Sequence, residues 1–211
     1  MREVMGSSPF ISTICPPEPF GFRWFFLAEH IAEMIGCAQF IEAGGGKMKT
    51  LYLIGGTMGA GKTTVSQQLK KELPNSVFLD GDWCWDASPF QVTEETKAMV
   101  MRNICFLLNS FLHCTAYENV IFCWVMHEQS ILDAIIRELD TKHCRVIKIS
   151  LVVDEINLKN RLSHDIALGI RTADIVDRSI ARIHLYQALD TIKVDTCNKT
   201  VHEITGEILA L

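Results

Sequence analysis

The most informative eight residues of this 211-residue sequence are Gly56-Thr57-Met58-Gly59-Ala60-Gly61-Lys62-Thr63, a full match to the pattern GxxxxGK[ST]. A short apolar run, 51–54, precedes the motif, and a helical pattern over 62–73, ended by Pro74, follows it. A strand, a glycine-rich turn and a helix in this order are the context in which the pattern forms a phosphate-binding loop, or P-loop. The sequence therefore predicts a nucleotide site here, in preference to a glycine-rich turn without a ligand.

The residue types in the loop suit ATP with Mg²⁺ as cofactors. Glycines let backbone N–H groups turn inward around phosphate oxygens, and the N-terminus of the following helix adds a partial positive charge. Lys62 is expected to neutralise the β- and γ-phosphates, and the Thr63 hydroxyl is expected to hold Mg²⁺. We expect ATP contacts along the whole loop, from Gly56, Thr57, Met58, Gly59, Ala60, Gly61, Lys62, Thr63 and Thr64.

Outward from the loop, short apolar runs alternate with helical patterns, which is typical of βαβ units. Five strands separated by helices predict an α/β fold with a doubly wound, five-stranded parallel sheet, which binds ligands beyond the carboxyl ends of its strands. The run over 120–126 is entirely apolar, so we expect a central strand covered on both faces. The expected strands cover 51–54, 77–79, 120–126, 146–153 and 192–194, and the expected helices cover 62–73, 93–114, 130–139, 155–168, 173–189 and 201–211.

A second chemical signal, Asp80-Gly81-Asp82-Trp83-Cys84-Trp85, follows the second expected strand. Both carboxylates can reach the γ-phosphate side of the P-loop, where one can orient Mg²⁺ or its waters and the other can accept a proton from an acceptor hydroxyl. Trp83 and Trp85 are candidates for an apolar wall. The alternative is a solvated acidic turn with two core tryptophans, but the neighbouring P-loop favours the functional interpretation.

Four arginines lie in the segment after the fourth expected strand. Guanidinium groups stay charged and bind phosphate in a bidentate way, so a flap that carries them can close over ATP and stabilise the transferring group. Ordinary surface charge is the alternative, because aspartates are available as ion-pair partners. The arginines are Arg161, Arg171, Arg178 and Arg182, and the aspartates are Asp165, Asp174 and Asp177.

With these features, residues 48–211 resemble the small P-loop kinases, a group that contains shikimate kinase, gluconate kinase, adenylylsulfate kinase and chloramphenicol phosphotransferase. They are also similar to P-loop proteins of the tunicamycin-resistance type, through the run from the P-loop helix into Leu73-Pro74-Asn75-Ser76. The resemblance depends on the P-loop, Asp80-Gly81-Asp82, the arginine segment and Asp195-Thr196 after the last strand. It implies a P-loop NTPase fold of the kinase type with an arginine-bearing lid.

The resemblance also implies roles for individual positions. Asp80 and Asp82 match the turn where these kinases hold the acceptor hydroxyl, and Arg171 matches the lid arginine. Arg161 matches an arginine that packs on adenine in several members, and the segment after Thr196 matches the loop that edges the base.

One departure from the family pattern concerns the third strand, 120–126, which lacks the acidic residue that many P-loop enzymes link to the metal. Asp80 or Glu128 can take that role beside Thr63, and the sequence leaves both open. His127, the first polar residue after the strand, is interpreted as a hydrogen-bonded histidine at a strand end in preference to a catalytic group.

These observations predict an ATP-dependent kinase that moves the γ-phosphoryl group to a small-molecule or nucleotide acceptor. We expect Lys62, Asp80, Asp82 and Arg171 to act in catalysis, with Asp82 as the general base because it lies further out from the sheet than Asp80. The alternative is an ATP-binding switch or slow ATPase, which needs no acceptor base. The expected acceptor-binding residues are Asp82, Trp83, Trp85, Arg102, Arg178 and Arg182.

The composition limits the partners. A formal charge of -5 and a pI near 5.8 give no general attraction for phosphate backbones, so no nucleic-acid partner is expected. Eight cysteines stand singly, without CxxC spacing, which indicates a reducing compartment. The apolar stretch 24–41 is interrupted by Glu29, His30 and Glu33, so it predicts neither a membrane span nor a secretory signal. We therefore expect a cytoplasmic protein without a membrane partner.

A boundary separates residues 1–47 from the kinase domain, 48–211. Residues 42–47, before Met48, have the sequence that a purine-rich ribosome-binding site encodes when it is read in frame. We therefore expect 1–47 to be an N-terminal extension outside the native protein, with Met48 as the natural start. The alternative is an amphipathic helix, 22–43, that docks on the domain.

Overall fold

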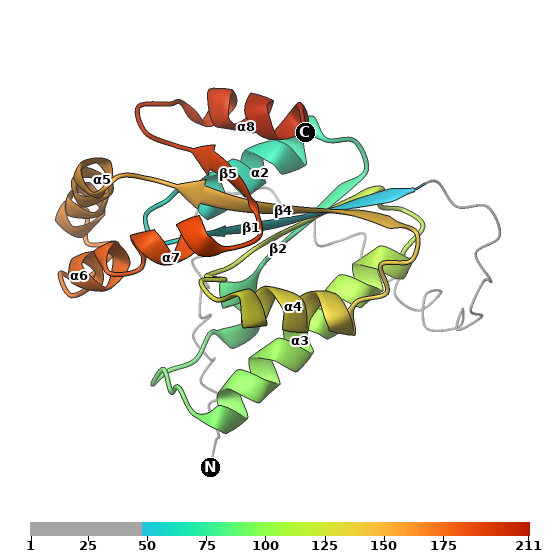
Figure 1. The fold of residues 1–211 in the computed structure, drawn as a ribbon. Coiled ribbons are helices and arrows are strands. Elements are labelled where there is room, and N and C mark those ends of the chain that lie inside the picture. Colours follow the sequence, from blue (N-terminus) through green and yellow to red (C-terminus); the bar gives the residue numbers. More distant parts are fainter. Residues whose placement is uncertain (1–47) are drawn as a thin grey trace, which may run out of the picture. The chain divides into compact units, whose positions relative to one another are not determined.

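The computed structural model describes residues 48–211, and within them five parallel strands form one sheet in the order β2-β3-β1-β4-β5 (Figure 1). β1 lies at the centre, with β3 paired to it on one side and β4 on the other. This order confirms the doubly wound α/β fold expected from the alternation of strand and helix patterns. The strands are β1 (Lys49–Gly56), β2 (Ser76–Asp80), β3 (Asn119–Cys123), β4 (Cys144–Val152) and β5 (Ile192–Asp195).

Helices cover both faces of this sheet (Figure 1). One face carries α2 (Lys62–Glu72) and α8 (Val201–Leu209), and the other carries α3 (Glu94–His113), α4 (Gln129–Glu138) and α7 (Ile183–Ala188). Two further helices, α5 (Glu155–Ala167) and α6 (Ile175–Ile180), lie toward the carboxyl ends of the strands, at the left of Figure 1. A 3-10 helix, η2 (Gly81–Trp85), follows β2 directly.

Each face of the sheet has its own hydrophobic core, because side chains along a strand alternate between the two faces. In β1, Leu51 and Leu53 pack with residues of α3 and α4, whereas Tyr52 and Ile54 pack with residues of α2 and α8. All five residues of β3 are buried, as expected for a central strand covered on both sides. The buried strands form a rigid support that brings the loops at their carboxyl ends together.

The third strand is shorter than expected. It ends at Cys123, whereas the apolar run that predicts it continues to Met126. After Cys123 the Met126 N–H donates to the carbonyl of Trp124, two residues earlier, at 3.1 Å. Because this bond turns the backbone away from the strand direction, the apolar residues of 124–126 lie in a loop at the edge of the sheet.

The prediction of a single helix over 173–189 is wrong. The structure has two short helices, α6 and α7, with a break at Ala181 and Arg182. At the break the Ser179 carbonyl accepts the Arg182 N–H (3.2 Å) and the hydroxyl of Thr57 (2.8 Å). The carbonyl therefore does not take the next helical N–H, and the helix ends. A contact with the P-loop thus interrupts a helical pattern that is continuous in the sequence.

Residues 1–47 lie outside the described residues. The expected start at Met48 and the alternative helix over 22–43 therefore stay predictions. Within residues 48–211, no helix has the length and apolar character needed to cross a membrane.

Gly81, the first residue of η2, is a point of close approach between two loops. A Cβ atom at this position would lie 2.5 Å from the ring of Trp124 and 2.9 Å from the Cβ atom of the same residue, so the whole indole would have to move. We expect Gly81→Ala to lower the free energy of unfolding by about 1–3 kcal/mol, as overpacking does. Chemical denaturation measures this change.

Gly206→Ala in α8 is the matched control, since nothing lies within 4 Å of a Cβ atom there. Inside a helix alanine is favoured over glycine by about 0.5–1 kcal/mol, so the control should be neutral or more stable. Equal stability of the two variants would contradict the packing of Trp124 on Gly81.

Candidate active site

The P-loop connects β1 to α2 at the carboxyl edge of the sheet. Its backbone turns tightly, with the Ala60 N–H donating to the Thr57 carbonyl at 3.1 Å. Gly59 and Gly61 have φ angles of 84° and 95°, a region that favours glycine. The first N–H groups of α2, which begins at Lys62, have no carbonyl partners within the helix. The loop therefore presents backbone donors and a helix N-terminus at one point, which suits a phosphate group.

Two neighbouring elements hold the P-loop in place. α5 packs against it, since a Cβ atom at Gly59 would lie 2.9 Å from the side chains of both Leu158 and Leu162. α6 is joined to it by the buried hydrogen bond in which the Thr57 hydroxyl donates to the Ser179 carbonyl. The sequence did not indicate this bond, because its partners lie 122 residues apart and the acceptor is a backbone atom.

Lys62 extends back over the loop, and its ammonium group donates to the Thr57 carbonyl at 3.1 Å. Burial lowers the pKa of Lys62, while Cys123 and the carboxylates of Asp82 and Asp80 act in the opposite direction. A cation in this position stands beside the phosphate-binding N–H groups and close to two acids from the neighbouring strand.

β2 brings Asp80 to the start of α2. The Thr63 hydroxyl donates to Oδ2 of Asp80 at 2.8 Å, and Oδ1 accepts the Asp82 N–H at 3.1 Å. The Asp80 side chain is buried. A hydroxyl and a carboxylate oxygen side by side are hard oxygen ligands of the kind that Mg²⁺ prefers. Among residues 48–211, no group of three or more His, Cys, Asp or Glu side chains could hold a metal ion, so phosphate oxygens and water would have to complete the coordination.

The third strand ends beside Asp80 with a thiol, since Cys123 pairs with Asp80 in register. Burial raises the pKa of Cys123 to about 12, and the Asp80 carboxylate adds to the rise, so the thiol stays neutral. Glu128 lies beyond the strand, exposed and paired with His127 at 3.5 Å. The structure therefore brings Asp80, and not Glu128, into contact with Thr63.

Asp82 stands further out from the sheet than Asp80, at the start of η2, and it is open to solvent on one side. Partial burial raises the pKa of Asp82, and the Asp80 carboxylate adds to the rise. Lys62 lowers the pKa of Asp82, and so does the nearby indole of Trp124. Trp124 is a site residue that the sequence reasoning missed. The sequence feature that could have indicated Trp124 is its position directly after a buried strand, at the edge where such sheets bind ligands.

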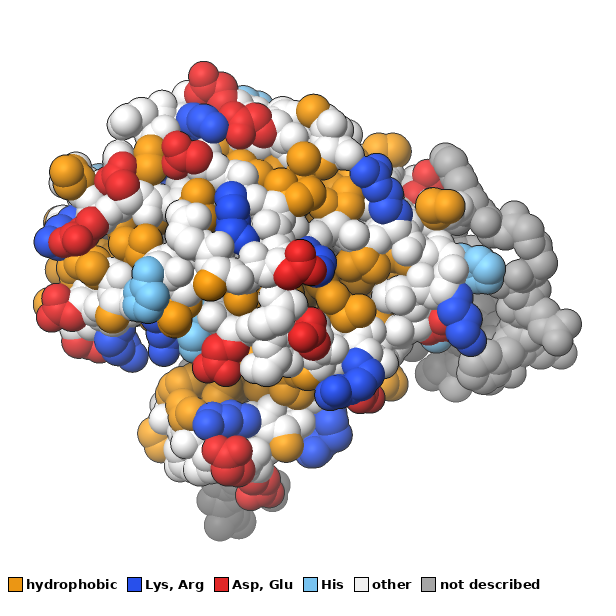
Figure 2. Space-filling view, viewed as in Figure 1, with side chains coloured by type: hydrophobic (Ala, Val, Ile, Leu, Met, Phe, Trp, Pro, Cys, Tyr) orange, Lys and Arg blue, Asp and Glu red, His pale blue; other side chains and the backbone are white. Residues whose placement is uncertain are grey.

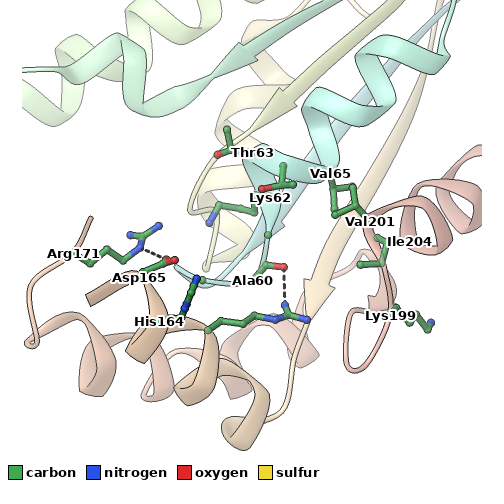
Figure 3. A pocket seen from close by; sticks show the side chains of 14 residues that line it. Ala60, Lys62, Thr63, Val65, His164, Asp165, Arg171, Lys199, Val201 and Ile204 are labelled. Atoms are coloured by element: carbon green, nitrogen blue, oxygen red, sulfur yellow. Dashed lines mark hydrogen bonds and ion pairs between the residues drawn. The ribbon is translucent and has the colours of Figure 1, made fainter. Parts of the chain in front are cut away.

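A cavity of about 390 Å³ opens beside the P-loop, and its size is in the range of small-ligand sites (Figure 3). Figure 3 shows Arg171 and Asp165 at its left, Lys62 and Thr63 near the middle, and the apolar side chains of α8 at its right. The cavity therefore has a charged end and an end where apolar side chains lie together with Lys199. Its lining residues are Gly59, Ala60, Gly61, Lys62, Thr63, Thr64, Val65, Arg161, His164, Asp165, Arg171, Lys199, Val201 and Ile204.

Of the five arginines expected at the site, Arg161 and Arg171 line this cavity. Arg161 donates to the carbonyl (2.5 Å) and hydroxyl (3.1 Å) of Thr196, and to the carbonyl of Ala60 (3.5 Å). It therefore ties the segment after β5 to the P-loop. Arg171 pairs with Asp165 at 3.0 Å, and the two side chains are 33% and 29% exposed (Figure 3).

The other expected arginines lie elsewhere. Arg178 and Arg182, expected on one face of a single helix, belong to different elements, with Arg178 in α6 and Arg182 at the break before α7. Arg178 pairs with Asp174 at 2.7 Å. Arg102 lies exposed on α3. Within the described part of the chain, none of these three lines the cavity beside the P-loop.

The two tryptophans of η2 separate onto different sides of the sheet. Trp83 meets Phe78 edge-on, with 5.2 Å between ring centroids, and Phe78 belongs to the core beneath α2 and α8. Trp85 packs against the core on the α3 side, and so does Trp124. The wall expected from Trp83 and Trp85 is therefore divided, and Trp124 takes a place beside Trp85 on the α3 side.

The parallel sheet, the glycine-rich loop and the helix that starts at its lysine define a P-loop domain. Residues 53–176, more than half of the chain, match the family AAA_18, described as an AAA domain. The chain belongs to this family.

Several proteins are similar to this chain over most of residues 48–211. Shikimate kinase of Bacillus cytotoxicus is 29% identical over 171 residues, which cover 77% of this chain and 97% of the relative. A sugar kinase from Janibacter sp. HTCC2649 superposes with a TM-score of 0.58 at 16% identity, covering 78% of this chain and 94% of that one. For the Deinococcus radiodurans tunicamycin resistance protein the TM-score is 0.57 at 16% identity, with coverages of 77% and 94%. At these identities the solved structures show the fold. Together the matches confirm the resemblance to small P-loop kinases.

Proposed function

We propose that the protein is an ATP-dependent kinase that transfers the γ-phosphoryl group to a hydroxyl of a small-molecule or nucleotide acceptor. One observation carries the proposal: Asp80 contacts Thr63 at the start of α2, and Asp82 stands two residues further out on the same edge. The similarity to a shikimate kinase over most of the domain supports the same class of reaction.

The cavity beside the P-loop is the proposed ATP site. Backbone N–H groups of the loop and of α2 bind phosphate oxygens, and Lys62 turns from the Thr57 carbonyl to the β- and γ-phosphates. Val201 and Ile204 offer an apolar surface to the base. Arg161, held flat by its bonds to Thr196, offers the base a guanidinium face.

Thr63 and Asp80 are the residues that would hold Mg²⁺. When bound, the ion supplies positive charge that neutralises the β- and γ-phosphate oxygens. Asp80 also fixes the backbone of Asp82 through the Asp82 N–H, so one carboxylate positions the next.

Asp82 is proposed as the general base. It accepts the proton of the acceptor hydroxyl as the oxygen attacks the γ-phosphorus, and a carboxylate with a raised pKa is a better base than an ordinary one. Arg171 leaves Asp165 in the closed state and contacts the transferring phosphoryl group, where a guanidinium stabilises the developing charge.

An ATP-binding switch or slow ATPase is the alternative function. Such a protein needs Lys62 and Thr63 but has no use for a second carboxylate next to Asp80, which accepts the Asp82 backbone N–H. The position of Asp82 therefore favours a kinase.

Acceptor-dependent ADP release tests the proposal. The protein is incubated with ATP and Mg²⁺ against a panel of hydroxyl compounds, and the rate without acceptor is the baseline. We expect at least one compound to raise ADP release and to carry the phosphoryl group afterwards, as mass spectrometry shows. ADP release at the same rate with and without every compound would favour the slow ATPase.

The segment 163–172, which carries Asp165 and Arg171, is expected to act as a lid. When a non-hydrolysable ATP analogue, Mg²⁺ and an acceptor are bound together, its amide hydrogens should exchange more slowly, because closure over the phosphates orders the segment. Hydrogen exchange followed by mass spectrometry measures this effect, with 106–113 of α3 as an internal reference. An exchange rate that stays the same in the lid and the reference would speak against closure.

A further inference from the structure

An indole ring lies against the residue that precedes Asp82 in the chain. Trp124 lies directly on Gly81, the residue before Asp82, since a Cβ atom at Gly81 would come within 2.5 Å of the indole. Its ring is partly buried and packs on the core shared with α3 and α4. The ring is therefore held in a fixed place beside the proposed base.

Two further aromatic rings, those of Trp85 and Phe90, lie in the segment that follows Asp82. Trp85 and Phe90 lie with their ring centroids 4.9 Å apart and their planes tilted by 39°. Trp85 packs on the same core as Trp124, and the Cys84 carbonyl accepts from the side chain of Asn103 in α3 (3.4 Å), which anchors η2 on that helix. Phe90 is 61% exposed. We call Trp85, Phe90 and Trp124 the aromatic rim.

Contact between exposed aromatic surface and water is unfavourable. A ligand that covers this surface therefore gains binding free energy from its burial. Figure 2 shows hydrophobic side chains where the lobe formed by η2 and the start of α3 meets the body of the domain. The rings offer flat faces, which stack well on flat apolar groups.

The segment that carries Trp85 and Phe90 has more acidic than basic residues. Residues 80–102 contain five acids, Asp80, Asp82, Asp86, Glu94 and Glu95, and two bases, Lys97 and Arg102. Lys97 is paired with Glu94 at 2.9 Å. Two cations of the cavity, Lys62 and Arg171, are assigned to the phosphates of ATP. An anionic acceptor would therefore meet like charge at Asp82, whereas an uncharged acceptor would not.

We propose that the acceptor is an uncharged hydroxyl compound with a flat ring, which stacks on the aromatic rim and presents its hydroxyl to Asp82. This proposal rests on the proposed kinase function, because it assigns the acceptor class of the same site. It separates the protein from kinases whose acceptors are carboxylic acids.

The test uses the full chain, saturated with Mg²⁺ and a non-hydrolysable ATP analogue, and measures the binding of matched probes by calorimetry. One pair is methyl shikimate and shikimate, which share a ring and hydroxyls but differ in charge. The other pair is thymidine and thymidine 5′-monophosphate. We expect the uncharged member of each pair to bind at least about tenfold more tightly.

Phe90→Ala should weaken binding of the uncharged probes by about tenfold through the loss of one stacked ring. Phe106→Ala is its control, because Phe106 is a similarly exposed phenylalanine, 72% accessible, in the C-terminal half of α3. Equal losses in the two variants would overturn the role of the rim. The acceptor class would be overturned if an anionic probe bound as tightly as its uncharged partner, or if neither uncharged probe bound.

The measurements separate this inference from the kinase proposal. Uncharged probes that bind at the rim without acceptor-dependent ADP release would support the acceptor class and contradict the kinase. Acceptor-dependent ADP release with shikimate or gluconate would support the kinase and overturn the acceptor class.

Discussion

Replacing Lys62 with alanine is expected to weaken the binding of ATP with Mg²⁺ by about 10- to 100-fold, the loss of one strong hydrogen bond to a charged group. The Lys62 ammonium group lies at the P-loop, where it donates to the Thr57 carbonyl. It is a partly buried cation, and the carboxylates of Asp82 and Asp80 raise its pKa against the effect of burial. Calorimetry with a non-hydrolysable ATP analogue measures the affinity.

The matched control is Lys71→Ala, which removes an exposed lysine from the last turn of α2, away from the P-loop. Circular dichroism should show both variants folded, because Lys62 contributes a single bond to the loop backbone. Unchanged nucleotide affinity in Lys62→Ala would remove the basis for an ATP site in this cavity.

Asp82→Asn is expected to slow phosphorylation of the acceptor by about 10²- to 10⁴-fold, the usual contribution of a general base. The substitution keeps the size and polarity of the side chain and removes the proton acceptor. ATP affinity should stay close to that of the parent, because Asp82 lies on the acceptor side, beyond the contact between Asp80 and Thr63. Rates are measured with the acceptor found by the ADP-release screen, at saturating ATP.

Asp80→Asn is the companion variant and should act differently. Asp80 accepts the Thr63 hydroxyl and would hold Mg²⁺, so its loss should raise the Mg²⁺ concentration needed for activity. Near-parental turnover by Asp82→Asn would contradict the assignment of the base. If Asp80→Asn were inactive at every Mg²⁺ concentration while Asp82→Asn stayed active, Asp80 would be the general base and Asp82 the residue that holds Mg²⁺.

The pH dependence provides a further check on Asp82. The base acts only when ionised, so the rate should fall as the pH drops through the pKa of Asp82, which lies above the usual value for an aspartate because of burial and Asp80. This acidic limb should be absent from the residual activity of Asp82→Asn.

Most of the fold could be predicted from the sequence, because its signals are local. The P-loop motif, with a strand before it and an amphipathic helix after it, placed β1 and α2 in one unit. The alternation of apolar runs with helical patterns placed the other four strands within a few residues of their bounds. The errors occurred where contacts distant in sequence decide the backbone, as in the helix over 173–189, which the Thr57 hydroxyl interrupts at Ser179.

The candidate site was only partly predictable. Spacing along the chain placed the loop donors, Lys62, Thr63 and the Asp80–Asp82 pair at the carboxyl edge, because each follows a strand or opens a helix. Spacing could not show which arginines face the cavity. Arg161 and Arg171 do, and Arg178 and Arg182 do not, because the side of the molecule to which each side chain points depends on how α5, α6 and α7 pack together.

The sequence by itself determined the P-loop, the order of strands and helices and the edge of the sheet that carries polar groups, since these depend on backbone preferences and on the spacing of apolar residues. Only the tertiary structure decided the neighbours of each functional group: Asp80 on Thr63, Trp124 on Gly81 and beside Asp82, and Arg171 on Asp165. These contacts join residues of different elements. Their geometry follows from the packing of helices on the sheet, which local sequence patterns do not contain.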